Sequence, residues 1–195
     1  MKVAIIKYNA GNIHSVELAL TRLGVKSILT DDPDVINAAD KVIFPGQGEA
    51  SSAMEYLTKH NLDSVLRNLG QPFLGICLGL QLMCKHSEEN NTTALGIFDT
   101  VVKKFQSKEL KIPQVGWNRV INIKTPLFSG IKEGSFFYFL HSFYAQKNSG
   151  NVIGETDYGI NYASALQHKN YYAVQFHPEK SGENGEKLLK NFLDL

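Results

Sequence analysis

One cysteine stands in a sequence pattern that is typical of a catalytic nucleophile. Residues 73–81 read Phe-Leu-Gly-Ile-Cys-Leu-Gly-Leu-Gln, which places glycines two positions before and two positions after Cys77. A buried strand is expected before this cysteine and a helix after it, and a Gly-x-nucleophile-x-Gly turn between them holds the side chain exposed at a sheet edge. The helix N-terminus favours a thiolate there. A cysteine packed in a core is the ordinary alternative, but the glycine spacing favours nucleophilic attack by Cys77.

A thiolate nucleophile works with a base, and the base works with a group that orients it. Residues 172–179 read Tyr-Ala-Val-Gln-Phe-His-Pro-Glu, an expected strand that ends at His177. Pro178 fixes the turn, so that Glu179 can point back at the imidazole. A His-Pro-Glu turn alone is typical of a surface loop. Together with the cysteine turn, it predicts a Cys77–His177–Glu179 triad.

Attack on an acyl carbon also requires N–H donors for the developing negative charge. The backbone N–H of Leu78, directly after the nucleophile, is one expected donor. The second is expected from Gly46, Gln47 and Gly48, in a glycine-rich loop at the end of another predicted strand. Glycines allow a peptide in such a loop to turn its N–H toward the site. A plain strand–helix turn has the same composition, so only the position of the loop at the end of a strand favours an oxyanion site.

The other potentially reactive side chains have no comparable setting. Cys84 falls on the expected helix after the nucleophile, and we expect it to pack in the core. His60, His86 and His168 fall near expected helix ends or in a turn, and we expect them in solvent. No set of His, Cys, Asp and Glu residues has recognisable zinc spacing, so neither a metal nor another cofactor is expected.

The elements that must position these residues alternate between strands and helices in the first half of the chain. Strands are predicted at Val3–Ile6, 25–29, Lys41–Phe44 and 72–76, and helices at 12–24, from about residue 51, and at 78–85. Such alternation implies parallel crossovers. The predicted fold is therefore α/β, with an open, mostly parallel central sheet and helices on both faces.

The second half of the chain, from about residue 97 to residue 176, has short aromatic-rich segments separated by Gly, Asn and Asp. We expect added antiparallel strands there, most clearly at 136–143 and 171–176, with one strand returning to the main sheet. The apolar spacing of residues 183–195 predicts a final helix that covers the sheet. No repeat or linker interrupts the sequence, so residues 1–195 are expected to form a single domain.

The composition of the chain gives no reason to expect nucleic acid or a membrane as a partner. The 195 residues carry a formal net charge of +1, from 20 basic and 19 acidic side chains, so neither nucleic acid nor a membrane is an expected partner. No apolar stretch suits a bilayer span or a signal peptide. The two cysteines form no framework of the secreted, disulfide-rich kind. A cytoplasmic location is therefore expected.

The cysteine turn, the Pro-Gly-Gln-Gly loop and the His-Pro-Glu pair, in this order, resemble the class I glutamine amidotransferases, which have a flavodoxin-like fold. Within that class the chain looks most like the glutaminase subunits of imidazole glycerol phosphate synthase, an enzyme of histidine biosynthesis. The closer resemblance lies in Tyr-Asn-Ala-Gly-Asn-Ile-His-Ser-Val at 8–16, Pro-Gln-Val-Gly-Trp-Asn at 113–118, Tyr-Phe-Leu-His-Ser-Phe at 138–143 and Gln-Phe-His-Pro-Glu-Lys-Ser at 175–181.

This resemblance implies hydrolysis of L-glutamine to glutamate and ammonia through a glutamyl thioester on the cysteine. It implies that Gln81 contacts glutamine and that His141, Ser142 and Phe143 hold the amino-acid end of the substrate. The residues alone would make His141 a half-buried strand histidine with a positional role.

The partner that the resemblance implies is a (β/α)₈-barrel cyclase subunit, bound as a heterodimer. The cyclase would use ammonia to make imidazole glycerol phosphate and release aminoimidazole carboxamide ribonucleotide. Free ammonia is largely protonated in neutral water, which gives a reason for a sealed path between the subunits. The implied interface set is Asn12, Trp117, Asn118, Tyr138 and Lys180. Without the resemblance, core packing would be favoured for the two aromatic residues and a solvated charge for the lysine.

The chain also departs from the family pattern, and other interpretations stay open. Gln47 replaces a usual Val in the glycine-rich loop, Gln114 a usual His and Phe143 a usual Tyr. The loop is expected to rearrange, so that the isolated chain is nearly inactive and the cyclase, with its nucleotide bound, switches it on. Alternatives are a glutaminase subunit of another class I amidotransferase, a catalytically silent docking subunit, or a cysteine hydrolase of peptides.

Overall fold

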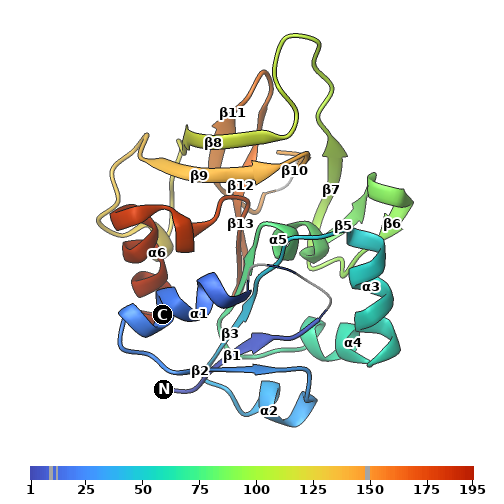
Figure 1. Ribbon diagram of the computed structural model, residues 1–195, viewed down its shortest axis with the longest axis vertical. Helices are drawn as coiled ribbons and strands as arrows, with labels where there is room; N and C mark the ends of the chain where they lie inside the picture. The colour runs from blue at the N-terminus through green and yellow to red at the C-terminus, as the bar shows by residue number, and fades with distance from the viewer. Residues whose placement is uncertain (9–10, 12, 148–149) are drawn as a thin grey trace.

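The computed structural model describes residues 1–8, 11, 13–147 and 150–195 of the chain (Figure 1). Its helices are α1 (Ile13–Arg22), α2 (Pro33–Asn37), α3 (Ala50–Lys59), α4 (Leu62–Arg67), α5 (Leu78–Met83) and α6 (Gly182–Asp194), with 3₁₀ turns η1 (Glu89–Asn91), η2 (Pro126–Phe128) and η3 (Pro178–Lys180). The first strands are β1 (Val3–Ile6), β2 (Ser27–Thr30), β3 (Lys41–Phe44), β4 (Phe73–Ile76), β5 (Cys84–Ser87) and β6 (Thr92–Thr93). The later strands are β7 (Phe98–Lys104), β8 (Gln114–Arg119), β9 (Phe136–His141), β10 (Phe143–Ala145), β11 (Val152–Asp157), β12 (Asn161–His168) and β13 (Tyr171–Val174).

Within this part of the chain, the strands form an 11-stranded sheet and a separate two-stranded one. The large sheet has the order β2-β1-β3-β4-β13-β12-β10-β7-β5-β6, with β11 paired to β12. Strands β2, β1, β3, β4 and β13 are parallel to their neighbours along this run, and β13 pairs antiparallel with β12. The predicted α/β sheet with added antiparallel strands is confirmed. The returning strand is β13, which comes late in the chain yet lies beside β4.

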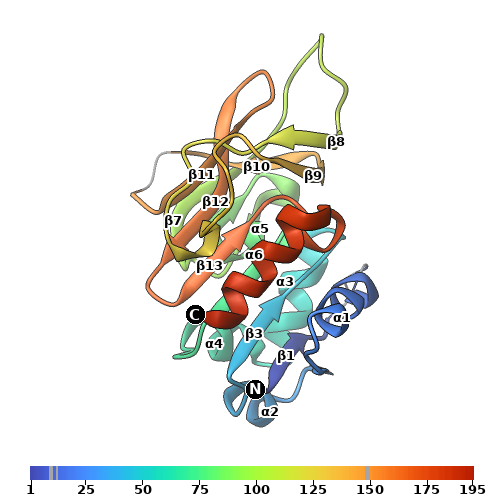
Figure 2. The same cartoon turned by 90° about the vertical axis from the view of Figure 1, so that its left-hand side faces the viewer.

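Helices cover both faces of the parallel strands, and Figure 2 shows α6 across the near side of the sheet. Successive residues of a strand point to opposite faces. On β1, Ala4 and Ile6 join a buried cluster with residues of α2 to α5, whereas Val3 and Ile5 join a second cluster with residues of α1 and α6. The inner strands β1 and β4 are therefore apolar along their whole length, as burial on both faces requires, whereas the edge strand β2 has two exposed residues.

Two predicted elements are wrong in their extent. The expected strand at 136–143 is divided at Ser142: β9 pairs with β8 in the separate hairpin, whereas β10 joins the large sheet. The expected helix at 78–85 ends at Met83, because Cys84 is extended, with φ −71° and ψ 174°. Cys84 opens β5, and pairing of β5 with β7 and β6 overrides the helical preference of the local sequence.

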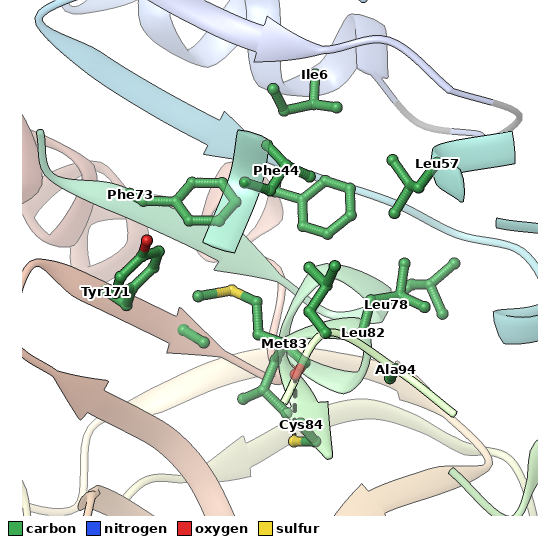
Figure 3. Close-up of a cluster of buried hydrophobic side chains, with 14 of the residues drawn as sticks. Ile6, Phe44, Leu57, Phe73, Leu78, Leu82, Met83, Cys84, Ala94 and Tyr171 are labelled. Atoms are coloured by element: carbon green, nitrogen blue, oxygen red, sulfur yellow. Dashed lines mark hydrogen bonds between the residues drawn. The ribbon is translucent and has the colours of Figure 1, made fainter. Parts of the chain in front are cut away.

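The core position expected for Cys84 is confirmed, and Figure 3 shows this residue beside Met83 in the cluster. Its thiol donates to the Leu80 carbonyl at 3.3 Å, and burial raises the pKa of the thiol. Cys84 is therefore a packed, protonated thiol. None of the helices in residues 1–8, 11, 13–147 and 150–195 has the length and apolar character needed to cross a membrane.

Candidate active site

Cys77 lies in the sharp turn between β4 and α5. Its backbone has φ 54° and ψ −104°, a conformation that costs energy for any residue with a Cβ. A Cβ on Gly79 would overlap the carbonyl oxygen of Phe44, and one on Gly75 would overlap the sulfur of Met83. The structure thus has the predicted Gly-x-nucleophile-x-Gly turn, called the elbow below, and at Gly79 a side chain would collide with backbone.

Cys77 and His177 follow neighbouring parallel strands. Ile76 and Val174, the last residues of β4 and β13, are partners in the sheet, and the N–H of Cys77 donates to the Val174 carbonyl at 2.8 Å. Both strands therefore deliver their next residues to the same edge of the sheet. The two side chains are well shielded, since Cys77 is 5% exposed and His177 1%.

The imidazole of His177 is bonded to Glu179 on one side. Its Nδ1 lies 2.8 Å from Oε1 of Glu179, so the carboxylate accepts from Nδ1–H; Nε2 is buried without a nitrogen or oxygen partner. Burial lowers the pKa of His177, but the charge and hydrogen bonding of Cys77 and Glu179 outweigh it and raise the pKa to about 10. This arrangement favours a thiolate–imidazolium pair.

The turn that carries His177 is fixed by three hydrogen bonds and one close contact. The N–H of His177 donates to the Tyr138 carbonyl on β9 at 2.8 Å. The Ser181 hydroxyl donates to the His177 carbonyl at 2.6 Å and accepts from the N–H of Tyr138 at 2.9 Å. Helix α6 closes on this turn, because a Cβ on Gly185 would overlap the carbonyl oxygen of Pro178. The imidazole is thereby anchored from two sides.

Three successive carbonyl groups in the loop after β3 each accept one hydrogen bond. They are those of Pro45, Gly46 and Gln47, and their donors are the Tyr8 hydroxyl (2.6 Å), the N–H of Leu78 (3.3 Å) and the N–H of Gly11 (2.9 Å), respectively. The N–H of Leu78, an expected oxyanion donor, is therefore already bonded to Gly46. In this conformation the loop does not form the predicted oxyanion hole.

A pocket of about 290 Å³ lies over the nucleophile. It brings together the predicted residues Gln47, Gly48, Cys77, Leu78, Gln81, His141, Ser142 and Phe143, and adds Glu89, Pro113 and Leu140. Gly46 meets the site only through its bond to Leu78, while His177 and Glu179 lie buried outside the lining. Segments from β3, β4 and β9 thus converge on one pocket.

Glu89 is a pocket residue that the sequence interpretation missed. It belongs to η1, and its Oε2 accepts from the N–H of Ala50 at 2.8 Å. Burial raises the pKa of this carboxyl, and Glu49 also raises it, against the opposing bond from Ala50. A carboxylate here can receive a cationic group in the pocket. The residue follows β5, an unpredicted strand, so no spacing in the sequence pointed to it.

His141 is a buried, neutral side chain in the lining of the pocket. Burial lowers its pKa to about 4, together with the charge of His177 and against the opposing bond to Phe143. Its Nδ1 lies 2.7 Å from the Phe143 carbonyl, which only accepts, so Nδ1 carries the proton. Nε2 is then an acceptor, and the Tyr162 hydroxyl at 3.2 Å is the group that can donate to it. His141 therefore fixes the 141–143 segment and stays uncharged.

The residues expected at a partner interface lie together on the hairpin and on η3. Trp117 and Tyr138 are cross-strand partners with ring centroids 6.1 Å apart, and Trp117 is 56% exposed, so core packing is wrong for this tryptophan. Lys180 is half-buried on η3. Asn118 donates to the Asp157 carbonyl at 2.8 Å, so its amide is engaged within the chain. Asn12 lies outside the described residues.

Of the three histidines expected in solvent, one is exposed and two are half-buried. His60 is exposed, as expected, whereas His86 and His168 are half-buried on β5 and β12. The described ranges contain no group of three or more His, Cys, Asp or Glu side chains that could hold a metal ion.

Comparison with known proteins agrees with the geometry of the site. The family model for glutamine amidotransferase class-I matches residues 4–195. The chain is 54% identical over 197 residues to the imidazole glycerol phosphate synthase subunit HisH of Bacteroides fragilis strain YCH46, covering 100% of both chains. It is 44% identical to the protein of the same name from Haemophilus influenzae strain Rd, covering 100% of this chain and 98% of that protein.

Solved structures share the fold at low sequence identity. A putative GMP synthase subunit from Thermoplasma acidophilum matches with a TM-score of 0.78 at 20% identity, covering 100% of this chain and 92% of that one. PurLQS from Thermotoga maritima matches with a TM-score of 0.73 at 18% identity, covering 99% and 97%. With the fold, the elbow and the full-length relatives in agreement, the chain belongs to the class I glutamine amidotransferase family and, within it, to the imidazole glycerol phosphate synthase subunit HisH group.

Proposed function

We propose that this chain is the glutaminase subunit of an imidazole glycerol phosphate synthase, with Cys77, His177 and Glu179 as its catalytic residues. One observation carries the proposal: in a member of the HisH group, a cysteine at a strained elbow lies beside a buried His–Glu pair. The reaction is hydrolysis of the glutamine side-chain amide to glutamate and ammonia. As in other biosynthetic enzymes of this kind, the chain would work in the cytoplasm.

The first half of the reaction forms a thioester. The Cys77 thiolate attacks the amide carbon of glutamine, and the carbonyl oxygen takes up negative charge. His177, protonated at Nε2, gives its proton to the nitrogen as the C–N bond breaks, so that ammonia leaves and a glutamyl thioester stays. Its pKa, raised to about 10, keeps the imidazolium available for this step.

The second half releases glutamate. His177 takes a proton from water, the hydroxide formed attacks the thioester carbon, and the thiolate of Cys77 leaves. Glu179 stays bonded to Nδ1 throughout and stabilises the imidazolium each time it forms. The proton on the imidazole at the end balances the thiolate, which restores the starting pair.

Substrate binding would use the polar groups that line the pocket over Cys77. The carboxylate of Glu89 pairs with the ammonium group of glutamine, because it is the acidic side chain in the pocket lining. Gln81 and the segment of His141, Ser142 and Phe143 line the same pocket and would contact the rest of the substrate. The amide of the substrate would then lie over Cys77, between these two contacts.

The loop after β3 sets the resting activity. Because the N–H of Leu78 is bonded to the Gly46 carbonyl at 3.3 Å, the oxyanion of the first intermediate would meet a carbonyl oxygen instead of a donor. The loop must turn at Gly46–Gln47–Gly48 before both N–H groups face the substrate. The isolated chain would therefore have little glutaminase activity, and the bound partner would supply the free energy for the turn.

The partner is a (β/α)₈-barrel cyclase that consumes ammonia. The exposed Trp117 and its neighbour Tyr138 offer an aromatic anchor of the kind that dominates binding energy in interfaces. Lys180 adds a cation beside this hairpin. Since the same β9 backbone holds His177, docking and catalysis share one element. Asn12 and Asn118 remain proposed members of the interface.

The experiment that tests the proposal separates glutamine from ammonia as nitrogen donor. A Cys77→Ala chain mixed with the cyclase should lose imidazole glycerol phosphate formation from glutamine and keep it from added ammonia. The matched control is Cys84→Ala, which removes the other thiol and should keep both activities. Glutamine-dependent turnover by the Cys77→Ala complex would contradict the assignment.

The alternative functions give different results in the same assay. A silent docking subunit would support the ammonia reaction only, in wild type and variant alike. The glutaminase of another class I enzyme would release glutamate without supporting this cyclase, and a peptide hydrolase would cleave peptides in place of glutamine. The relatives at 44–54% identity favour the proposed function over these.

A further inference from the structure

A fully buried glutamine lies against the sulfur of the nucleophile and is not needed by any step described so far. Gln175 follows β13 directly, and its register partner position on the β4 side is Cys77, since Val174 pairs with Ile76. Its side chain is 0% exposed, and its Nε2 lies 3.6 Å from Sγ of Cys77. This is a normal separation for an N–H donor and a larger sulfur acceptor.

The amide of Gln175 belongs to a series of hydrogen bonds that also includes the amide of Gln81 and the carbonyl of Phe143. Gln81, which is 5% exposed, places its Nε2 3.1 Å from the Phe143 carbonyl and 3.3 Å from Oε1 of Gln175. Gln81 therefore uses its two N–H bonds on two oxygen acceptors. The chain runs from the backbone of β10, through two buried amides, to the catalytic sulfur.

The direction of this chain is fixed by chemistry. A backbone carbonyl only accepts, so the group of Gln81 that touches Phe143 must be its NH₂. The atom of Gln175 facing that same NH₂ must then be its oxygen, which leaves its own NH₂ facing Cys77. Reversing the Gln175 amide would place two NH₂ groups together and an oxygen against the sulfur. The Phe143 carbonyl therefore determines the orientation of both amides, and exchanging the oxygen and nitrogen of either one would break a hydrogen bond.

A donor and an acceptor meet the sulfur from the protein. The Sγ–H of Cys77 points to the Leu140 carbonyl at a long 3.7 Å, a contact that only the protonated thiol can make. The N–H of Gln175 can bond to sulfur in both states and bonds more strongly to the thiolate. The thiolate thus lacks the weak bond to the Leu140 carbonyl but has a stronger bond from the N–H of Gln175. The N–H of Gln175 therefore stabilises the charged sulfur, in addition to the imidazolium of His177.

We propose that Gln175 is a further catalytic residue of the amide hydrolysis, whose side-chain N–H donates to the Cys77 thiolate, with Gln81 holding its amide in the donating orientation. This rests on the proposed role of Cys77. Gln175 does not line the substrate pocket, so it reaches the sulfur from the interior and does not compete with glutamine. It also ties the nucleophile to the Phe143 wall of that pocket.

The test measures the thiol directly. The full chain, with and without its cyclase, is treated with iodoacetamide from pH 5 to pH 10, and fragment-ion mass spectrometry separates alkylation at Cys77 from that at Cys84. In Gln175→Met the midpoint of Cys77 alkylation should rise by about one pH unit, with about tenfold slower alkylation below it. The kcat for glutamine should fall by a similar factor, with little change in KM.

A second variant keeps the proposal testable if Gln175→Met folds poorly. Gln175→Glu keeps the size of the side chain and the oxygen that accepts from Gln81, but its ionised carboxylate cannot donate and repels the thiolate. Its midpoint should rise more than that of Gln175→Met. Gln167→Met, a glutamine on the neighbouring strand β12 bonded to Tyr172, is the matched control and should behave as wild type.

Two results would overturn the inference. One is an unchanged alkylation midpoint in a folded Gln175 variant. The other is a raised KM without a shifted midpoint, which would mean that Gln175 only supports the pocket wall. Failure of the proposed function looks different, because the Cys77→Ala complex would then still use glutamine.

Discussion

The main-chain N–H of His177 donates to the carbonyl oxygen of Tyr138 at 2.8 Å. The turn that carries the proposed base is therefore bonded to β9, a strand of the hairpin that carries the exposed aromatic side chains. Tyr138 belongs to β9, whose partner β8 carries Trp117. A displacement of this hairpin acts on the position of the imidazole through this bond and through the Ser181 hydroxyl, which bonds to both residues. The arrangement links what happens at the surface to the geometry beside Cys77.

Truncation of the exposed tryptophan tests this surface. Trp117→Ala removes an aromatic anchor that is 56% exposed, so we expect the dissociation constant for the cyclase to rise at least tenfold, with a folded and thermally unchanged chain. The measurement is isothermal titration calorimetry with the purified cyclase. Ile28→Ala, which removes a 51% exposed side chain from β2, an edge strand of the large sheet and not of the hairpin, is the control. Equal weakening by both variants would count against an interface at the hairpin.

The pH dependence of turnover tests the imidazolium. Because the pKa of His177 is raised to about 10, the protonated ring persists at neutral pH and is lost only as the pH climbs through that value. The alkaline limb of kcat/KM should therefore lie near pH 10. Glu179→Gln removes a supporting charge, which lowers the pKa, so the limb should move down by about one unit or more. Glutamate release by the complex is the measurement, and Glu183→Gln, at an exposed position, is the control. An alkaline limb that does not move in Glu179→Gln would show that Glu179 does not support the charge of His177.

Acid stability tests the neutral state of His141. In the unfolded chain a histidine takes a proton near pH 6.5, whereas burial holds the pKa of folded His141 at about 4. Its contribution to stability is thus complete above pH 6.5 and is lost as the pH falls toward 4. The loss amounts to about 3 kcal/mol. Urea unfolding at several pH values should show a weaker pH dependence in His141→Gln than in wild type, and no such change in the exposed His60→Gln. Identical pH curves for His141→Gln and wild type would refute a neutral His141.

The elbow glycine gives a prediction about stability. A Cβ on Gly79 would overlap the Phe44 carbonyl oxygen, a backbone atom that cannot swing away. Gly79→Ala should therefore lower the free energy of unfolding by about 3 kcal/mol or more. Gly70→Ala, with nothing within 4 Å of the added methyl group, should change it by a few tenths. Comparable melting curves for the two variants would show that the turn can relax around a side chain.

The sequence predicted the parts of the site that depend on local pattern. Glycine spacing around Cys77 and a histidine at a strand end are local signals, and the rule that parallel strands end at one edge was enough to bring the two together. The division of 136–143 at Ser142 was not predictable in this way. Both halves have the same aromatic, strand-like composition, and only their different partners, β8 and β7, separate them.

The residues that were missed depend on long-range pairing. Glu89 reaches the pocket because β5 turns away from the helix and pairs with β7, a contact between segments that no local periodicity records. Gln175 was visible as part of the His-Pro-Glu segment, but its role depends on the register of β13 against β4. The bonded state of Leu78 likewise depends on the conformation of a loop from another strand. Each belongs to tertiary structure rather than to propensity.

The place of β13 in the sheet has a consequence for the making of the protein. Its strand lies between β4 and β12, at the centre of the molecule, yet a ribosome synthesises it almost last. A growing chain that has already exposed the Cys77 segment has no base beside it and a gap in its sheet. A prematurely terminated product is therefore unable to fold around, or to activate, its thiol.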